Sequence, residues 1–326
     1  MDGSMLPNSG LPAWHKGEIA LQRHAGVAGR MAEIGSRVLR PLLIEQHRNF
    51  YPLLPFVVLG AVDKAGDVWA TLRAGHPGFL ASPDPLHLNV AMPRESSDPA
   101  DAGMEDGDMV GLLGIDLHTR RRNRLNGRIE RQDGTGFAIA VEQSYGNCPQ
   151  YIQQRSFAFH REPGTPAPLP ARHLDRLDAR ARAMITGSAG FFVATYVTRE
   201  DGHAQVDVSH RGGRPGFVRV DADGTLTVPD FAGNRFFNTL GNMLVNPRAG
   251  LVFIDFAMGD LLQLTGEAQV VLDDPEIMEI DGAERLWRFR PRQVVYRPQA
   301  LPLHWDFDEA TGWSPEALAN GVWERS

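Results

Sequence analysis

The residues of this 326-residue sequence best suited to chemistry are arginines and asparagines beside turns. Gly233-Asn234-Arg235 comes before an apolar-periodic segment that ends at Asn246-Pro247, and Asn234 is a good N-cap for a short helix there. A helix start offers backbone N–H groups and a positive dipole end, to which Arg235 adds a guanidinium. The pattern predicts an anion site whose natural occupant is phosphate. A capped helix with a solvated arginine explains the same residues equally well.

A second group of arginines lies in an alternating segment, where every second residue shares a face of a strand. Alternation places Arg120, Arg122 and Arg124 on one face, which suits a nucleotide or another anionic substrate. A solvated edge strand guarded by charge is at least as good an interpretation.

The single cysteine, Cys148, follows Gly146-Asn147 and precedes Pro149 in a predicted turn. A nucleophilic cysteine needs a base, and His118 and His160 are the available imidazoles. A structural thiol that shapes the turn is the simpler interpretation. One cysteine excludes an intrachain disulfide framework and an iron–sulfur centre, and it is typical of a reducing compartment. We therefore expect a cytoplasmic protein without a metal site, and no catalytic residue is assigned.

Composition and missing motifs narrow the function further. A net charge of −7 gives no general attraction for nucleic acid. No run of about 18 apolar residues predicts a membrane span, and residues 1–5 lack the start of a secretion signal. There is no Gly-x-Gly-x-x-Gly, Walker, Gly-x-Ser-x-Gly or His-Glu-x-x-His motif. Only Lys16 and Lys64 are lysines, so the basic residues favour bidentate anion recognition over Schiff-base chemistry.

The elements that must position these residues form an internal repeat. Four pairs of segments match at nearly constant offset, about 135–139 residues: 56–60 with 191–195, 71–79 with 209–217, 110–116 with 249–255, and 125–127 with 264–266. Each copy alternates short apolar segments with Gly, Pro and Asp turns, which predicts a small antiparallel barrel. The copies differ where the second has the helix-like segment 231–246. There the first has the acidic segment 92–108, part of a turn-rich region over 82–108 that we expect on the surface.

Helical spacing and prolines divide the chain around these copies. Apolar residues over 18–48 predict one or two helices with a break at Pro41, and spacing over 174–185 predicts another. Four prolines over 163–170 predict a linker. We expect an N-terminal helical segment at 1–50, a first repeat at 51–160, a linker and helix at 161–185, and a second repeat at 186–326.

The second copy contains six short motifs at 191–195, 208–213, 215–220, 226–230, 233–235 and 246–248. Together they resemble the pyridoxamine 5′-phosphate oxidase-like family of FMN-binding split β-barrels, strongly over about 185–272 and weakly over 50–160. Segments 118–124 and 146–152 look like the start of bacterial flavoproteins in which such a barrel is fused to a ferredoxin-reductase-like module. The resemblance implies an α+β, mainly β fold: two split β-barrels in tandem, with N-terminal and inter-barrel helices.

The resemblance also implies an FMN site in the second barrel. It implies that the phosphate is held at Ser209, Arg211, Asn234 and Arg235, and that the rings lie along 217–219 and 228–230. Asn238, one helical turn beyond Asn234, could face the same ligand. The expected cofactor site is therefore Ser209, Arg211, Phe217, Val218, Arg219, Val228, Pro229, Asp230, Asn234, Arg235 and Asn238.

The function implied is that of an FMN-dependent oxidoreductase. Its partner is a small-molecule substrate or NAD(P)H, with Arg120, Arg122 and Arg124 as a landing face, or a separate reductase protein. Single-barrel members of the family hold FMN between two subunits, so we expect a homodimer. Two alternatives stay open: a non-catalytic flavin- or haem-binding split barrel, and an enzyme that depends on Cys148.

Overall fold

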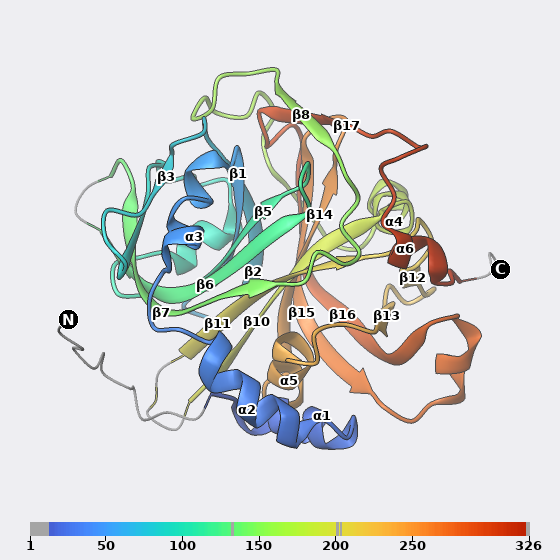
Figure 1. The fold of residues 1–326 in the computed structure, drawn as a ribbon. Helices are drawn as coiled ribbons and strands as arrows, with labels where there is room; N and C mark the ends of the chain where they lie inside the picture. The colour runs from blue at the N-terminus through green and yellow to red at the C-terminus, as the bar shows by residue number, and fades with distance from the viewer. Residues whose placement is uncertain (1–12, 132–133, 200–201, 203, 324–326) are drawn as a thin grey trace.

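The structure is a computed structural model that describes residues 13–131, 134–199, 202 and 204–323 (Figure 1). Most of its strands belong to a seven-stranded and an eight-stranded sheet, and the helices are short. The expected mainly β, α+β chain is confirmed at this level. Residues 1–5, read above for a secretion signal, lie outside the described residues.

The first sheet is antiparallel and runs in the order β2-β1-β5-β6-β7-β4-β3. Its strands are β1 (Phe56–Val62), β2 (Val68–Ala74), β3 (Leu80–Ala81), β4 (His87–Val90), β5 (Met109–Asp116), β6 (Arg121–Glu130) and β7 (Phe137–Asn147). Because β6 pairs with β5 on one side and β7 on the other, the interpretation of the arginine run as an edge strand is wrong.

The second sheet runs in the order β11-β10-β14-β15-β16-β13-β12, with β9 also paired to β16. Its strands are β9 (Arg172–Leu174), β10 (Gly190–Thr198), β11 (Ala204–Gly212), β12 (Arg219–Val220), β13 (Leu226–Phe231), β14 (Arg248–Asp255), β15 (Asp260–Val271) and β16 (Ala283–Arg297). Position for position, its main path repeats the strand order of the first sheet. A further pair joins β8 (Ser156–Phe159) to β17 (Leu303–Asp306).

Short helices connect and cover the sheets. They are α1 (Lys16–His24), α2 (Ala28–Val38), α3 (Glu45–Arg48), α4 (Ala179–Thr186), α5 (Asn238–Val245) and α6 (Pro315–Ala319), with 3-10 turns η1 (Tyr51–Leu53), η2 (Pro99–Gly103) and η3 (Pro275–Glu279). The helix expected over 174–185 begins later, because the Asp178 side chain caps it by accepting from the backbone N–H of Ala181 at 2.8 Å. Leu174 belongs to β9 instead.

The two sheets meet face to face over a shared apolar core. Val58 and Leu113 of the first sheet are fully buried against Phe192 and Val208 of the second. Gly111 lies at this junction, where a Cβ would be 2.7 Å from the Val206 carbonyl oxygen. The backbones therefore approach more closely there than any side chain allows.

The turn-rich region 82–108 lies only partly on the surface, and the expected surface excursion is wrong for the buried part of the acidic segment 92–108. Met92, Asp98, Ala100, Asp101 and Met104 are all buried in it. Its carboxylates can be buried because arginines on the strands beneath pair with them, as described below.

Candidate functional site

An arginine-rich cavity of about 100 Å³ lies where the two sheets meet. One wall is formed by β6 and the turn after β7, and the other by β11, β13, the 231–237 turn and the first turn of α5. A cavity of this size accommodates a few water molecules or one oxyanion. It is smaller than the roughly 300–1,000 Å³ of a pocket that encloses a whole drug-sized ligand.

Most of the expected cofactor residues line this cavity. Those that do are Ser209, Arg211, Phe217, Pro229, Asp230, Asn234, Arg235 and Asn238. Arg122 and Arg124, which the sequence suggested as part of a separate anion face, line the same cavity from the first sheet, together with Cys148. Two groups of residues that the sequence kept apart therefore form one site.

Four of the expected residues have side chains elsewhere. Val218 and Val228 are buried in the apolar core of the second sheet. Arg219 forms ion pairs with Asp221 at 2.8 Å and Glu276 at 2.5 Å. Arg120 precedes β6 with a positive φ of 60°, and it donates to the carbonyl oxygens of Gly312 and Trp313.

The expected helix start at Asn234 is wrong. The Asn234 side chain accepts from the backbone N–H of Phe236 at 3.1 Å, which closes a turn and not a helix. Arg235 and Phe237 both have positive φ, so helical backbone cannot begin before Asn238. The cavity is consequently lined by the first turn of α5, including Thr239, and the positive end of that helix favours an anion there.

Arg124 connects the two walls of the cavity. Its Nη1 donates to the Tyr145 hydroxyl at 2.6 Å and to the Asn238 side-chain oxygen at 2.9 Å, and its Nη2 donates to the Ser209 hydroxyl. Burial alone would lower the pKa of Arg124, but Tyr145 and Asp207 raise it above its usual value. The guanidinium is thus charged although its side chain is almost fully buried.

Two other arginines bring charge that the protein does not balance locally. Arg122 donates from Nε to the Cys148 carbonyl oxygen at 2.6 Å, and burial beside Arg124 and Arg211 lowers its pKa to about 9. Arg211 comes no closer than 3.9 Å to the Asp230 carboxylate, and burial lowers its pKa as well. The buried Nε atoms of both Arg124 and Arg211 have no hydrogen-bond partner among the described residues.

The remaining two cavity arginines are already paired. Arg235 donates from both terminal nitrogens to the Glu284 carboxylate, at 2.5 and 2.6 Å. Arg285 donates from Nε to Asp230 at 3.1 Å and also pairs with Glu284. Arg235 is therefore less available to a ligand than the sequence suggested.

Neither His210 nor Cys148 has the surroundings of a catalytic pair. His210 is buried against Phe192, and burial lowers its imidazole pKa well below the usual value, so the ring is neutral. Cys148 is a half-buried free thiol. No imidazole is hydrogen-bonded to it in the described part of the chain.

A polar network beneath the cavity was not identified from the sequence. Figure 1 shows α1 beside α5, and Glu18 of α1 accepts from the Asn238 side-chain amide at 2.5 Å. Burial, reinforced by Asp207, raises the pKa of Glu18 to about 8. His15 and Asn242 are 2.8 Å apart, and Asn242 donates to Asp207 at 3.2 Å. The partners lie too far apart in the chain for any local signal to reveal them.

No group of three or more histidine, cysteine or acidic side chains among the described residues is arranged to hold a metal ion. No described helix is long and apolar enough to cross a membrane.

No protein-family model matches the sequence, and no curated protein does. Solved structures do match parts of it. HupZ of Group A Streptococcus is 13% identical over 36% of this chain and 90% of its own, with a TM-score of 0.28. A putative pyridoxamine 5′-phosphate oxidase of Lactobacillus delbrueckii is 18% identical over 32% of this chain and 95% of its own, with a TM-score of 0.26.

The haem storage protein HutZ of Vibrio cholerae is 15% identical over 38% of this chain and 95% of its own, with a TM-score of 0.26. TM-scores this low carry no argument about ligand or activity, which must come from the cavity and the sequence motifs. In structure, the chain is similar to split-barrel proteins of the pyridoxamine 5′-phosphate oxidase family.

Proposed function

We propose that this chain is a tandem split-barrel flavoprotein that holds the phosphate of FMN in the arginine-rich cavity and acts as an oxidoreductase. One observation carries the proposal: Arg124 and Arg211 both line the cavity, and each has a buried Nε atom with no hydrogen-bond partner in the described part of the chain. An unsatisfied buried donor costs about 1–3 kcal/mol, and more when charged. A bound phosphate supplies the acceptor oxygens and the negative charge that these groups lack.

The charge of the cavity also suits a phosphate monoester. Among the described residues, five arginines and one carboxylate, that of Asp230, line it, and Glu284 outside the lining pairs with two of the five, Arg235 and Arg285. Glu18 lies beneath it, but a pKa of about 8 leaves most of this side chain uncharged at neutral pH, so it cancels little of the positive charge. Because the cavity holds only an oxyanion-sized group, the rings of the ligand would extend beyond it.

The chain's own residues anchor and neutralise the ligand. Arg124 and Arg211 would hold the phosphate, Ser209 and Thr239 present hydroxyl groups 2.9 Å apart beside it, and Arg122 adds a charge. Bound FMN would supply hydride and electron transfer, so that no obligatory acid–base pair is needed from the protein. This agrees with a cavity whose histidine is neutral and whose cysteine has no base among the described residues.

The first test identifies the ligand. We expect the purified protein, or apoprotein incubated with flavins, to retain FMN and not FAD, because FMN alone ends in a phosphate monoester. Mass spectrometry of the heat-released ligand decides this. Recovery of FAD or haem, or failure to bind FMN, would overturn the proposal.

A second test addresses activity. Anaerobic titration with NADH and NADPH should bleach the flavin slowly if either is a donor. A flavin that no nicotinamide nucleotide, small substrate or added reductase reduces would make the protein a non-catalytic carrier. Thiol alkylation distinguishes the Cys148-dependent alternative, since we expect reduction to survive it.

The cavity takes walls from both sheets of a single chain, so the proposed phosphate site is complete within one subunit. We still propose a homodimer from the family resemblance. Light scattering with and without FMN tests it, and we expect a dimer in both cases.

A further inference from the structure

The internal repeat places a second arginine site opposite the candidate cavity. On the matched strands β2 and β11, Thr71 corresponds to Ser209 and Arg73 to Arg211. Further along, Glu95 corresponds to Asn234. In the candidate cavity, β6 of the first sheet faces β11 of the second. In the second site the roles of the sheets are exchanged, because β15 and β16 of the second sheet face β2 of the first. For example, Gln263 of β15 donates to the carbonyl oxygen of Ala70 on β2 at 3.0 Å.

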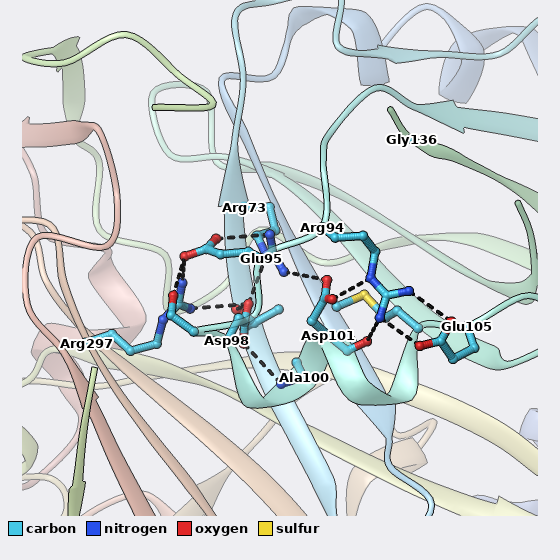
Figure 2. A network of polar contacts seen from close by, with 12 residues as sticks. Arg73, Arg94, Glu95, Asp98, Ala100, Asp101, Glu105, Gly136 and Arg297 are labelled. Carbon is cyan, nitrogen blue, oxygen red and sulfur yellow. Dashed lines mark hydrogen bonds and ion pairs between the residues drawn. The ribbon is translucent and has the colours of Figure 1, made fainter. Parts of the chain in front are cut away.

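In this second site the arginines are fully engaged by carboxylates of the segment 92–108 (Figure 2). Asp98 accepts from Arg73 Nε at 2.8 Å and from the Thr71 hydroxyl at 2.6 Å. Arg297 of β16 is 3.2 Å from the same carboxylate. Glu95 pairs with Arg73 at 3.0 Å and also with Arg297.

Asp98 therefore occupies the position that an oxyanion would take between a hydroxyl and an arginine Nε. It is fully buried, and although burial opposes its charge, Arg297 and Arg73 lower its pKa to about 2. The matched atom in the candidate cavity, Arg211 Nε, has no partner among the described residues. The two sites thus differ in one respect. In the site around Arg73 the chain itself supplies an anion, the Asp98 carboxylate, whereas the candidate cavity has no such group at Arg211 Nε among the described residues.

We propose that the site around Arg73 and Arg297 is a second anion-binding site that the chain keeps closed with Asp98 and Glu95. A chain then takes one phosphorylated ligand, in the open cavity, and not two. Only the identity of that ligand rests on the proposed function. A cavity of about 840 Å³ is lined by Arg73 and Glu95, so one side of the closed site borders open space.

The test shortens the two closing side chains, Glu95→Ala and Asp98→Ala, because an amide of the same size would still fill the position that the oxyanion must take. Asp98→Ala also removes the cap of η2, where Asp98 now accepts from the Ala100 N–H at 3.1 Å, and this loss is the same in chloride and in phosphate. Both changes are made in an Arg211→Ala chain, so that the open cavity contributes little. The probe is inorganic phosphate, titrated at constant ionic strength against chloride, and the readout is the midpoint of thermal unfolding.

The variant that lacks the Glu95 and Asp98 carboxylates should be destabilised in chloride and stabilised saturably by phosphate, while Asp101 still pairs with Arg73 at 3.0 Å. At ten times the dissociation constant, its midpoint should rise by about 2 °C. Glu105→Ala in the same Arg211→Ala chain is the matched control, because Glu105 lies in the same segment but its carboxylate pairs with Arg94. The control and the Arg211→Ala parent should show no saturable rise.

A folded variant without the Glu95 and Asp98 carboxylates that responds to phosphate no more than the control would overturn the proposal. If this variant does not fold in chloride, recovery of its native circular dichroism on refolding in phosphate supports the closed site, and no recovery in either salt overturns it. FMN titration of the unmodified chain is read separately. The two proposals can therefore fail independently.

Discussion

Replacing Arg211 with alanine should weaken FMN binding more than replacing Arg235. The two arginines line the same cavity, but their pairing differs. Within the described part of the chain, Arg211 has an unpartnered Nε and one distant carboxylate, Asp230 at 3.9 Å. Arg235 forms a bidentate ion pair with Glu284. A ligand gains a new hydrogen-bond donor from the first and must compete with Glu284 for the second.

The size of the difference follows from these contacts. A hydrogen bond to a charged group is worth about 1.5–3 kcal/mol, so Arg211→Ala should raise the Kd for FMN roughly ten- to hundred-fold. Arg235 is partly exposed, so an ion pair that it forms with phosphate in place of Glu284 is worth only about 0–1 kcal/mol. Arg235→Ala should change Kd by less than about five-fold.

Quenching of flavin fluorescence during titration of apoprotein measures both constants. Circular dichroism and thermal unfolding show that each variant is folded. Arg211→Lys serves as a second comparison, since it keeps the charge but lacks the Nε donor, and its loss should be intermediate. Equal losses for Arg211→Ala and Arg235→Ala, or a larger loss for Arg235→Ala, would refute the assignment of the phosphate to Arg211.

Three further predictions concern charge and packing around the cavity. The pKa of Glu18 is about 8 in the folded chain and near 4.5 in the unfolded chain, so between these pH values the folded chain binds one more proton, and the free energy of unfolding falls as pH rises through them. Glu18→Gln should remove up to about 4 kcal/mol of this pH dependence, measured by urea unfolding at pH 5 and pH 8.5. An unchanged difference in unfolding free energy between the two pH values would contradict the burial of Glu18. Arg122→Glu should slow the reduction of bound flavin by NAD(P)H and make it less sensitive to salt in anaerobic stopped-flow experiments; rates indifferent to both changes would leave Arg122 a structural residue. Gly111→Val should lower the unfolding midpoint and weaken FMN binding together, because a side chain there must push the sheets apart; loss of one property alone would separate the junction from the cavity.

The sequence predicted the equivalent strands, and many residues that line the cavity, better than the surroundings of those residues. The repeat offset paired 71–79 with 209–217, and those segments include equivalent strands, β2 and β11. Alternation placed Arg122 and Arg124 on one side of β6, and both line the cavity. No local pattern could predict that β6 faces β11, because this contact depends on how the two sheets pack across a shared core.

The errors have a common physical origin. Asn234 has the right residue type for a helix cap, but the positive φ of Arg235 and Phe237 moves the helix start to Asn238. Acidic residues over 92–108 favour solvent by composition, yet Asp98 is buried because two distant arginines compensate its charge. Local preference was overridden in both cases by partners that only the folded chain brings near.

The carboxylates of 92–108 have a consequence for how such a protein can diverge. When two identical subunits form two equivalent sites, every substitution appears in both, so a residue that fills one site fills the other. Two copies in one polypeptide are free of that constraint. Here Glu95 stands in one copy and Asn234 at the matched position of the other. Covalent linkage thus lets one copy exchange a dissolved ligand for a permanent internal one, while its neighbour keeps its arginines open to solutes.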